Sequence, residues 1–285
     1  MKLRAHAKIN IGLHILGKRS DGYHDLETVF HEINMFDEIE LEPHNQLAMT
    51  ADSILVPVDE TNLCLRAAQL LQSELKVEQG ALIHLKKNIP VGAGLGGGSS
   101  DAAAVLIGLN KLWSLKLKNN KLRKIAAAIG SDVPFFIEGG TAYATGRGEV
   151  LQHFGLDVPF WIVLVTPPRH VSTAWAYQSL KSDRQGKAID LRNTLTEHIL
   201  KPKKLTAVVQ NDFEATVFEV HPEILRTKEK LADCGALFSL MTGSGSSVFG
   251  FFDDADRAKS SIKEFPQAYA VSITEPHFRV RQDIE

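Results

Sequence analysis

Residues 90–104 are the segment that most constrains this chain, and they read PVGAGLGGGSSDAAA. Five of the seven residues 92–98 are glycine, and Ser99, Ser100 and Asp101 follow them. Such a density of glycine lets a backbone adopt positive φ and approach a ligand closely. The three polar residues are good N-caps and the apolar residues after them have helical spacing, so the positive end of a helix dipole should face the loop. The segment therefore predicts a phosphate-binding loop.

Two commoner glycine-rich loops fit this segment less well. A Walker A loop that starts at Gly92 would need its lysine at position 98, which is Gly98. Gly92, Gly94 and Gly97 match the G-x-G-x-x-G pattern of dinucleotide-binding folds, but residues 102–131 contain no Asp or Glu to hold a ribose. A flexible linker is not usually followed at once by a capped apolar helix. The pattern favours a phosphate site of another kind.

Length and charge narrow the class of protein. A chain of 285 residues can form one large domain or two moderate ones, and we expect two. A formal net charge of −2 gives no basic face for nucleic acid or for an anionic membrane, so we expect neither partner, and the basic run 116–124 is a solvated surface. The chain shows no signal peptide, transit peptide or long apolar segment. These features predict a cytoplasmic protein that is a monomer or a homodimer and acts on a small molecule.

Cysteine usage points to reduced side chains. Cys64 and Cys234 are the two cysteines, each inside an apparent helix and neither in a metal-type cluster. We expect both to be reduced, buried and structural.

The first half of the chain mixes strands and helices in an irregular order, which predicts an α+β arrangement rather than a doubly wound parallel sheet. Alternation of apolar and polar residues predicts strands at 3–7, 38–42 and 81–86. Helical spacing predicts a helix over 65–75 capped by Thr61 or Asn62, and one over 122–129 capped by Asn119 or Asn120 and ended by Gly130.

A break is expected near residues 156–159, which divides the chain into domains 1–156 and 157–285. The second domain is expected to have a split β-α-β, ferredoxin-like layout. The charged stretch 181–187 is expected to be a surface loop. The predicted elements of this domain are a buried strand at 160–165, a short helix capped by Ser172 or Thr173, a helix from Pro222 to Gly235, strands at 236–240 and 248–252, and a final helix and strand ending near 273.

Four segments of the chain resemble the GHMP kinases, the superfamily of galactokinase, homoserine kinase and mevalonate kinase. Residues 90–104 resemble its second motif, 241–247 its third, and 130–136 the segment with its acidic catalytic residue. Residues 7–13 and 19–24 resemble the first motif of one branch, which phosphorylates 4-diphosphocytidyl-2-C-methyl-D-erythritol. The segments occur in family order and together span nearly the whole chain.

The resemblance implies a two-domain GHMP kinase fold, with a nucleotide-binding α+β domain followed by the ferredoxin-like one. It also implies ATP-dependent phosphorylation of the 2-hydroxyl of this cytidine diphosphate derivative, in the non-mevalonate (MEP) route to isoprenoid precursors. The cofactors implied are ATP, as phosphoryl donor, and Mg²⁺. The alternative is another small-molecule kinase of the superfamily, of the homoserine or mevalonate type.

The resemblance implies Lys8 and Asp132 as catalytic residues. Lys8 ends an apolar strand, where an unpaired ammonium is costly, so either it has an anionic partner such as Asp132 or a phosphate, or it is an ordinary surface lysine. Asp132 could remove the proton of the substrate hydroxyl, could orient that hydroxyl and Lys8, or could simply cap the next segment.

The resemblance also implies two sets of binding residues. Ser99 or Ser100 would place a hydroxyl near a phosphate oxygen or Mg²⁺. Tyr23 and His24 would stack on the cytosine and hydrogen-bond its edge, with Tyr177 as the second wall. Asn10 could bond the acceptor polyol or Asp132. The nucleotide set is Asn62, Lys87, Pro90, Val91, Gly92, Ala93, Gly94, Leu95, Gly96, Gly97, Gly98, Ser99 and Ser100, and the substrate set is Asn10, Tyr23, His24, Asp132, Tyr177, Gly243, Ser244 and Gly245.

Overall fold

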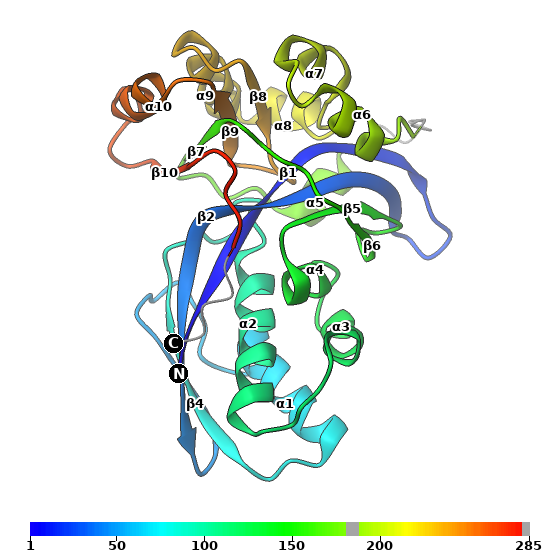
Figure 1. Cartoon of the computed structure of the whole chain (residues 1–285), viewed down its shortest axis with the longest axis vertical. Coiled ribbons are helices and arrows are strands. Elements are labelled where there is room, and N and C mark those ends of the chain that lie inside the picture. The colour runs from blue at the N-terminus through cyan, green and yellow to red at the C-terminus, as the bar shows by residue number, and fades with distance from the viewer. Residues whose placement is uncertain (181–187, 281–285) are drawn as a thin grey trace.

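The computed structural model describes residues 1–180 and 188–280, which form two β-sheets with helices around them (Figure 1). The stretch 181–187, expected to be a surface loop, lies outside the described residues. No described helix is long and apolar enough to cross a membrane.

The first sheet has six strands in the described chain and is built on two long antiparallel ones, β1 and β2. Its strand order is β3-β4-β2-β5-β6, and β1 pairs with β2 beside this path. All three strands that the sequence predicts in this half are confirmed, although β1 and β2 run further than predicted. The bounds are β1 (Lys2–Lys18), β2 (His24–His44), β3 (Leu47–Ala51), β4 (Gly80–Lys86), β5 (Thr141–Thr145) and β6 (Val150–His153).

Four helices cover one side of this sheet (Figure 1): α1 (Leu63–Leu75), α2 (Gly97–Leu112), α3 (Asn119–Ala127) and α4 (Val133–Glu138). The long apolar helix α2 lies in the centre and packs against α1, α4 and both long strands. The Asn62 side chain accepts a hydrogen bond from the Cys64 amide at 2.8 Å, which confirms the predicted cap of α1.

Three predicted helix boundaries are wrong. Helix α2 begins at Gly97, with Gly96 as N-cap, so Ser99, Ser100 and Asp101 lie inside the helix and none of them is its N-cap. The reason is that Gly96 has a φ of +70°, which lets the chain enter the helix while still in the glycine run. Helix α3 has Lys118 as N-cap with no side-chain bond, so neither Asn119 nor Asn120 caps it, and it ends at Ala127, before Gly130.

Within the described residues, the second sheet has four strands in the order β10-β7-β9-β8, and all neighbours are antiparallel. Counted along the chain these strands are 1 to 4, so the order is 4-1-3-2, and helices α9 and α10 make the two crossings. This order confirms the split β-α-β layout. The bounds are β7 (Trp161–Thr166), β8 (Phe238–Met241), β9 (Val248–Phe252), β10 (Ala270–Thr274), α9 (Pro222–Asp233) and α10 (Ala255–Ser261).

Shorter helices fill the connection between β7 and α9. Ser172 caps the first of them by accepting a hydrogen bond from the Trp175 amide, as one of the two predicted candidates. The bounds are α5 (Thr173–Gln178), α6 (Leu191–His198), α7 (Pro202–Val208) and α8 (Glu214–Val220), and a 3-10 turn (Ile262–Glu264) follows α10.

The two sheets share buried residues. One apolar cluster joins Ile9 and Val29 of the long strands to Leu164 of β7 and Phe251 of β9. The chain passes from the first sheet to the second between β6 and β7, and the domain boundary at 156/157 falls in this connection but stays a prediction.

The two cysteines differ in burial. Both are free thiols, and Cys64 is buried in α1 as predicted. Cys234 is only half-buried, so its predicted burial is wrong, because it lies one residue beyond α9, at the C-cap.

Gly108 gives a test of how closely α2 approaches the long strands. A Cβ at this position would lie 2.4 Å from the Cδ1 of Leu41 and 3.0 Å from that of Leu3. Alanine gains about 1 kcal/mol in helix propensity over glycine, whereas overpacking a core costs about 1–3 kcal/mol. Because Leu41 is fully buried, its side chain could give way only by displacing other core residues, so we expect Gly108→Ala to lower the free energy of unfolding. Urea denaturation would measure it, with Gly155→Ala, which meets no atom within 4 Å, as the control; an unchanged or raised value would contradict the close packing.

Candidate active site

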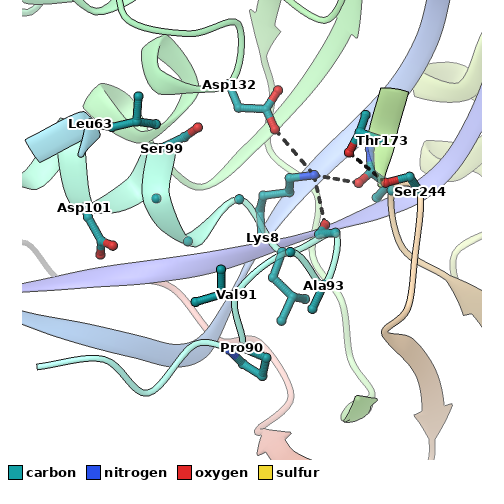
Figure 2. Close-up of a pocket in the computed structure, with 18 of the residues that line it drawn as sticks. Lys8, Leu63, Pro90, Val91, Ala93, Ser99, Asp101, Asp132, Thr173 and Ser244 are labelled. Atoms are coloured by element: carbon teal, nitrogen blue, oxygen red, sulfur yellow. Dashed lines mark hydrogen bonds and ion pairs between the residues drawn. The ribbon is translucent and has the colours of Figure 1, made fainter. Parts of the chain in front are cut away.

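A cavity of about 490 Å³ lies where the first sheet meets the connecting segments of the second half of the chain. It is lined by β1 and β2, the glycine-rich loop, the start of α1, Asp132 and the turn that carries Gly243 and Ser244. Figure 2 shows these parts converging on the side chain of Lys8. Segments from both ends of the chain therefore meet at one site.

The glycine-rich loop has the conformation for which glycine is needed. Gly92, Gly94 and Gly96 have φ values of +69°, +80° and +70°. A Cβ on Gly94 would lie 2.3 Å from the carbonyl oxygen of Thr242, and one on Gly96 would lie 2.9 Å from the ring of Phe136. The loop is thus wedged between α4 and the turn after β8, with its backbone open to the cavity.

The structure brings the predicted nucleotide residues to this cavity with one exception. Residues 90–99, Asn62 and Lys87 all line it. Ser100 does not, because it is buried in the first turn of α2 and lines a separate cavity on the other side. Its amide donates to the Gly96 carbonyl within the helix. Of the two candidate hydroxyls, Ser99 is the one in position.

Lys8 lies in the middle of β1 rather than at the end of a strand, so that part of its prediction is wrong. Its side chain is 5% exposed, and Nζ donates to Oδ1 of Asn10 at 2.8 Å and to the Gly94 carbonyl at 3.2 Å. Oδ2 of Asp132 lies 3.6 Å from Nζ. Burial lowers the pKa of Lys8 below its ordinary value, and Asp132 opposes that shift. The ammonium has acceptors on several sides, so it is not a surface lysine.

Asp132 occupies the N-cap position of α4, yet its side chain makes no capping hydrogen bond. The alternative that it serves only as a cap is therefore wrong. Its side chain is 32% exposed and faces the cavity beside Lys8 (Figure 2). A carboxylate that is paired with a buried ammonium and still reachable from the cavity can contact a bound hydroxyl.

Asn10 orients Lys8. Its Oδ1 accepts from Lys8, its Nδ2 donates to the Thr28 hydroxyl at 2.8 Å, and its backbone amide donates to the Thr242 hydroxyl at 2.9 Å. The predicted bond to Asp132 is not among these contacts. Thr28 and Thr242 were missed in the sequence, and the position of Thr242 beside the third motif was the available signal.

The turn after β8 contributes Gly243 and Ser244 to the cavity but not Gly245. Gly243 has a φ of +56° and packs on Gly94, where a Cβ would lie 3.1 Å from the Cα. The Ser244 hydroxyl lies 3.0 Å from that of Thr173, at the start of α5. Asn211, which the sequence analysis did not single out, holds the turn by donating to the Gly243 carbonyl at 2.8 Å.

The predicted cytosine clamp is only partly formed. His24 and Tyr177 stack directly on each other, with ring centroids 5.1 Å apart, so no base fits between them in this arrangement. Burial lowers the pKa of His24, so its ring is a weaker base than an ordinary histidine ring. Burial also raises the pKa of Tyr177 to about 12, so Tyr177 stays protonated. Tyr23 is 57% exposed and lies outside this stack, and of the three predicted clamp residues only Tyr177 lines the cavity.

Arg147 was missed in the sequence. It lines the cavity, and its guanidinium lies 4.7 Å from the centre of the Tyr23 ring. It sits between Gly146 and Gly148, both with positive φ, and Gly148 lies close to Asp132, since a Cβ there would be 4.0 Å from Oδ1. A cation thus links the predicted base-binding side of the cavity to its catalytic side. The Gly-Arg-Gly run was the available signal.

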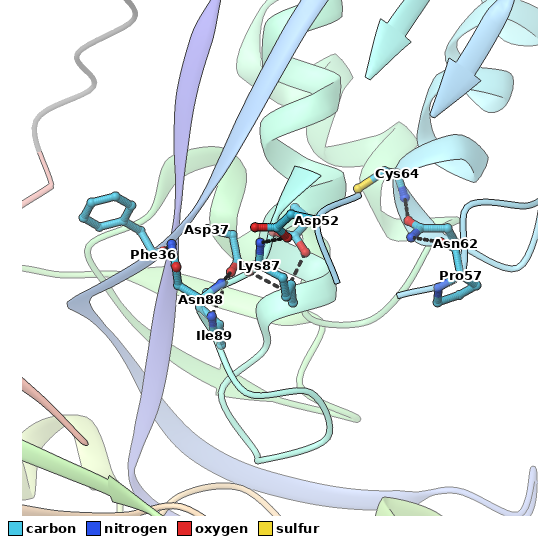
Figure 3. A network of polar contacts seen from close by, with 10 residues as sticks. Phe36, Asp37, Asp52, Pro57, Asn62, Cys64, Lys87, Asn88 and Ile89 are labelled. Atoms are coloured by element: carbon cyan, nitrogen blue, oxygen red, sulfur yellow. Dashed lines mark hydrogen bonds and ion pairs between the residues drawn. The ribbon is translucent and has the colours of Figure 1, made fainter. Parts of the chain in front are cut away.

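Lys87 is held by carboxylates next to the glycine-rich loop (Figure 3). Its Nζ donates to Asp37 and, at 2.7 Å, to Asp101. Burial opposes its charge, but Asp101 and Asp37 together raise its pKa. Burial also raises the pKa of Asp101 to about 8. Oδ1 of Asp101 is buried and has no hydrogen-bond partner among the described residues. Lys87 thus serves to fix the chain before the loop.

Comparison with known proteins matches most of the chain to the family that its sequence motifs resemble. Residues 62–140 match the family model of the GHMP kinases N terminal domain, and residues 202–271 match that of the GHMP kinases C terminal domain. The chain is 42% identical over 283 residues to the 4-diphosphocytidyl-2-C-methyl-D-erythritol kinase of Chlorobium phaeobacteroides, with 99% of each covered. It is 44% identical over 283 residues to the enzyme of that name from Chlorobium limicola, with 98% of each covered.

Solved structures agree. A crystal structure of a 4-(cytidine 5'-diphospho)-2C-methyl-D-erythritol kinase superposes with a TM-score of 0.84 at 32% identity, over 96% of this chain and 98% of that one. A homoserine kinase from Cytophaga hutchinsonii superposes with a TM-score of 0.73 at 18% identity, over 96% of this chain and 95% of that one. The second likeness shows the fold alone.

Gly96 gives a test of the loop as the triphosphate site. Gly96→Val would place branched carbons against Phe136 and Lys8 at a φ of +70°, with a strain of about 1–3 kcal/mol. We expect a folded protein that no longer binds ATP, measured by calorimetry, because the displaced loop no longer presents its amides. Gly155→Val is the matched control, because Gly155 lies outside the cavity and a Cβ there would meet no atom within 4 Å. Normal ATP binding by Gly96→Val would remove the loop from the nucleotide site.

Proposed function

The chain belongs to the 4-diphosphocytidyl-2-C-methyl-D-erythritol kinases of the GHMP superfamily, and from that premise we propose how it transfers the γ-phosphoryl group of ATP to the 2-hydroxyl of this substrate. The observation that carries the proposal is that Lys8 and Asp132 face the glycine-rich loop across one cavity. Relatives at 41–44% identity over nearly the full chain favour this substrate over those of the homoserine and mevalonate kinases.

The donor side of the cavity is the glycine-rich loop. Its backbone amides, at the N-terminus of α2, would hold the triphosphate, as helix starts commonly hold anions. Asn62 and Val91 also line the cavity, where the base would bind, and Nζ of Lys87 lies close to Gly97 at the start of α2. Mg²⁺ would arrive with the nucleotide, since this ion is usually held by substrate phosphates and one or two protein oxygens. Ser99 and Asp132 offer such oxygens and line the cavity.

The acceptor side runs from Tyr23 and His24 to Asp132. Cytosine would enter against His24 and Tyr177, which must separate from their present stack to receive it. The Arg147 guanidinium, between the base end and Asp132, would face the diphosphate that joins the cytidine to the polyol. The turn at Gly243 and Ser244 closes this side of the cavity.

In the transfer itself, the oxygen of the 2-hydroxyl would attack the γ-phosphorus while the bond to the β–γ bridging oxygen breaks and ADP leaves. We propose that the carboxylate of Asp132 accepts the hydroxyl proton and later releases it to solvent. Lys8 would stabilise negative charge that develops on the transferred group, and Asn10 holds it in place. Phosphoryl transfer depends mostly on such positioning and charge compensation.

The substrate proposal predicts selectivity for the cytidine-bearing polyol. The enzyme should phosphorylate it with ATP and Mg²⁺ and should leave methylerythritol phosphate, which lacks the cytidine, nearly untouched. Tyr177→Ala should weaken substrate binding by about 1–3 kcal/mol, the range for one base-stacking aromatic ring, with little change in ATP affinity. Tyr177→Phe, which keeps the ring, is the control. Equal losses for substrate and ATP would give Tyr177 a structural role, and comparable turnover of the two polyols would refute the substrate assignment.

The transfer mechanism predicts that Lys8 and Asp132 act as a unit. Asp132→Asn keeps the shape and removes the negative charge, so kcat should fall about 10²–10⁴-fold while substrate still binds. Lys8→Met should also lower kcat severely, and the double variant should be little worse than the poorer single one. Asp157→Asn, at an exposed aspartate that bonds His277, is the control. A near-normal kcat for Asp132→Asn would exclude base catalysis at this position and leave the kinase assignment standing.

A further inference from the structure

A second cavity, of about 500 Å³, lies on the other side of α2 from the active site and shares no lining residue with it. Phe136 separates the two: it lines the second cavity, and its ring abuts Gly96 of the phosphate loop. The walls come from β1, β2, α2, α4 and the segment after β10. The apolar part of the wall is Leu3, Ala104, Ile107, Phe136, Phe278 and Val280.

Glu32 is a buried carboxylate in this cavity with no cation beside it in the described chain. It is 7% exposed, and its one hydrogen bond within that part is from the Gly140 amide to Oε2, at 2.5 Å. Lys8 is its direct partner across β1 and β2, but the Lys8 ammonium is directed to Asn10 and Asp132 instead. A buried carboxylate is costly unless it is paired, so this one is suited to receive a cation.

A second acceptor faces the same cavity. Nδ1 of His6 lies 3.1 Å from the Ile33 carbonyl, which can only accept, so Nδ1 carries the hydrogen. Burial lowers the pKa of His6, which keeps the ring neutral and leaves Nε2 as an acceptor. The interior of the cavity thus offers acceptors to a group with several N–H donors.

The rim has the opposite character. Arg4 and Arg279 are exposed and line the cavity, and neither has an ion pair among the described residues. Arg4 lies on the ring of Phe36, with its guanidinium carbon 4.7 Å from the ring centre. The third charged residue of the rim, Glu138, is paired with Arg123 at 3.0 Å. Two guanidinium groups are therefore available to an anion at the mouth.

We propose that this second cavity binds a small zwitterion with an apolar body, such as an apolar α-amino acid, with its ammonium at Glu32 and His6, its carboxylate at the arginines of the rim and its side chain on the apolar wall. The three chemical regions of the cavity match the three parts of such a molecule. The proposal does not depend on the reaction catalysed in the first cavity.

Three probes with the same apolar side chain separate the contributions of the ammonium and the carboxylate to binding. They are leucine, 3-methylbutylamine, which lacks the carboxylate, and 4-methylpentanoate, which lacks the ammonium. Each probe would be titrated into the ¹⁵N-labelled full chain, with binding measured by NMR. Leucine should bind saturably, and the amine should bind more weakly. The carboxylic acid should not bind measurably. Binding of none of the probes, or of the acid as well as leucine, would overturn the proposal.

Two variants locate the binding. Glu32→Gln keeps the acceptor for the Gly140 amide and removes the charge, so leucine and the amine should both bind roughly tenfold to a hundredfold more weakly, as for loss of a charged hydrogen-bond partner. Arg279→Ala, at an exposed position, should reduce the advantage of leucine over the amine, because only Arg4 then faces the carboxylate, and should leave the amine unaffected. Glu40→Gln, on the same strand outside the cavity, is the control. Unchanged leucine binding by folded Glu32→Gln would place any site elsewhere.

The pH dependence gives a check with a definite sign. Burial raises the pKa of Glu32 to about 7, and the ammonium needs the ionised carboxylate, so affinity for the amine should rise roughly tenfold from pH 6 to pH 8. Burial lowers the pKa of His31 to about 4, so His31 does not supply this rise, and burial also lowers the pKa of His6 below its ordinary value. A flat or falling profile would contradict the role of Glu32. The other charged groups on the elements packed around Glu32 are Lys8, Arg4, Glu138 and Arg279.

Discussion

The burial of one ammonium group organises this protein. Lys8 is held in the middle of the first strand with its side chain only 5% exposed, and its charge is tolerated because Asn10, the Gly94 carbonyl and Asp132 surround it. Each of these groups comes from a different part of the fold: the same strand, the glycine-rich loop and the start of α4. Compensation of a buried charge needs close contacts. The charge therefore fixes the relative positions of the parts that form the active site.

Glycine makes those contacts possible. The loop can lie between Phe136 and the turn after β8 only because Gly94 and Gly96 have no side chain and adopt positive φ. The turn after β8 also packs on the glycine-rich loop, through Gly243. The second sheet supplies that turn, so the four-stranded sheet completes a site whose catalytic groups belong to the first. This arrangement explains why motifs near both ends of the chain are required for one cavity.

The sequence predicts the elements better than the contacts between them. Alternation along 38–42 and the cap at Asn62 are local signals, and both are confirmed. The start of α2 was misplaced because the left-handed conformation of Gly96 and its close approach to Phe136 belong to the folded structure, and no local sequence pattern contains them. Arg147 was missed for a similar reason: its role depends on Tyr23, 124 positions away in the sequence and in contact only after folding. The stack of His24 on Tyr177 likewise arises from tertiary packing.

The most direct measurement for this account is the pKa of the Lys8 ammonium, from ¹⁵N NMR of lysine side chains in the free enzyme and in the complex with ADP. If burial dominates and the site is built around the charge, the pKa of Lys8 lies below its ordinary value of 10.5 in the free enzyme. It should fall further in Asp132→Asn, which removes the neighbouring negative charge, and rise when the nucleotide phosphates bind. A pKa at or above the ordinary value, unmoved by either change, would contradict the account.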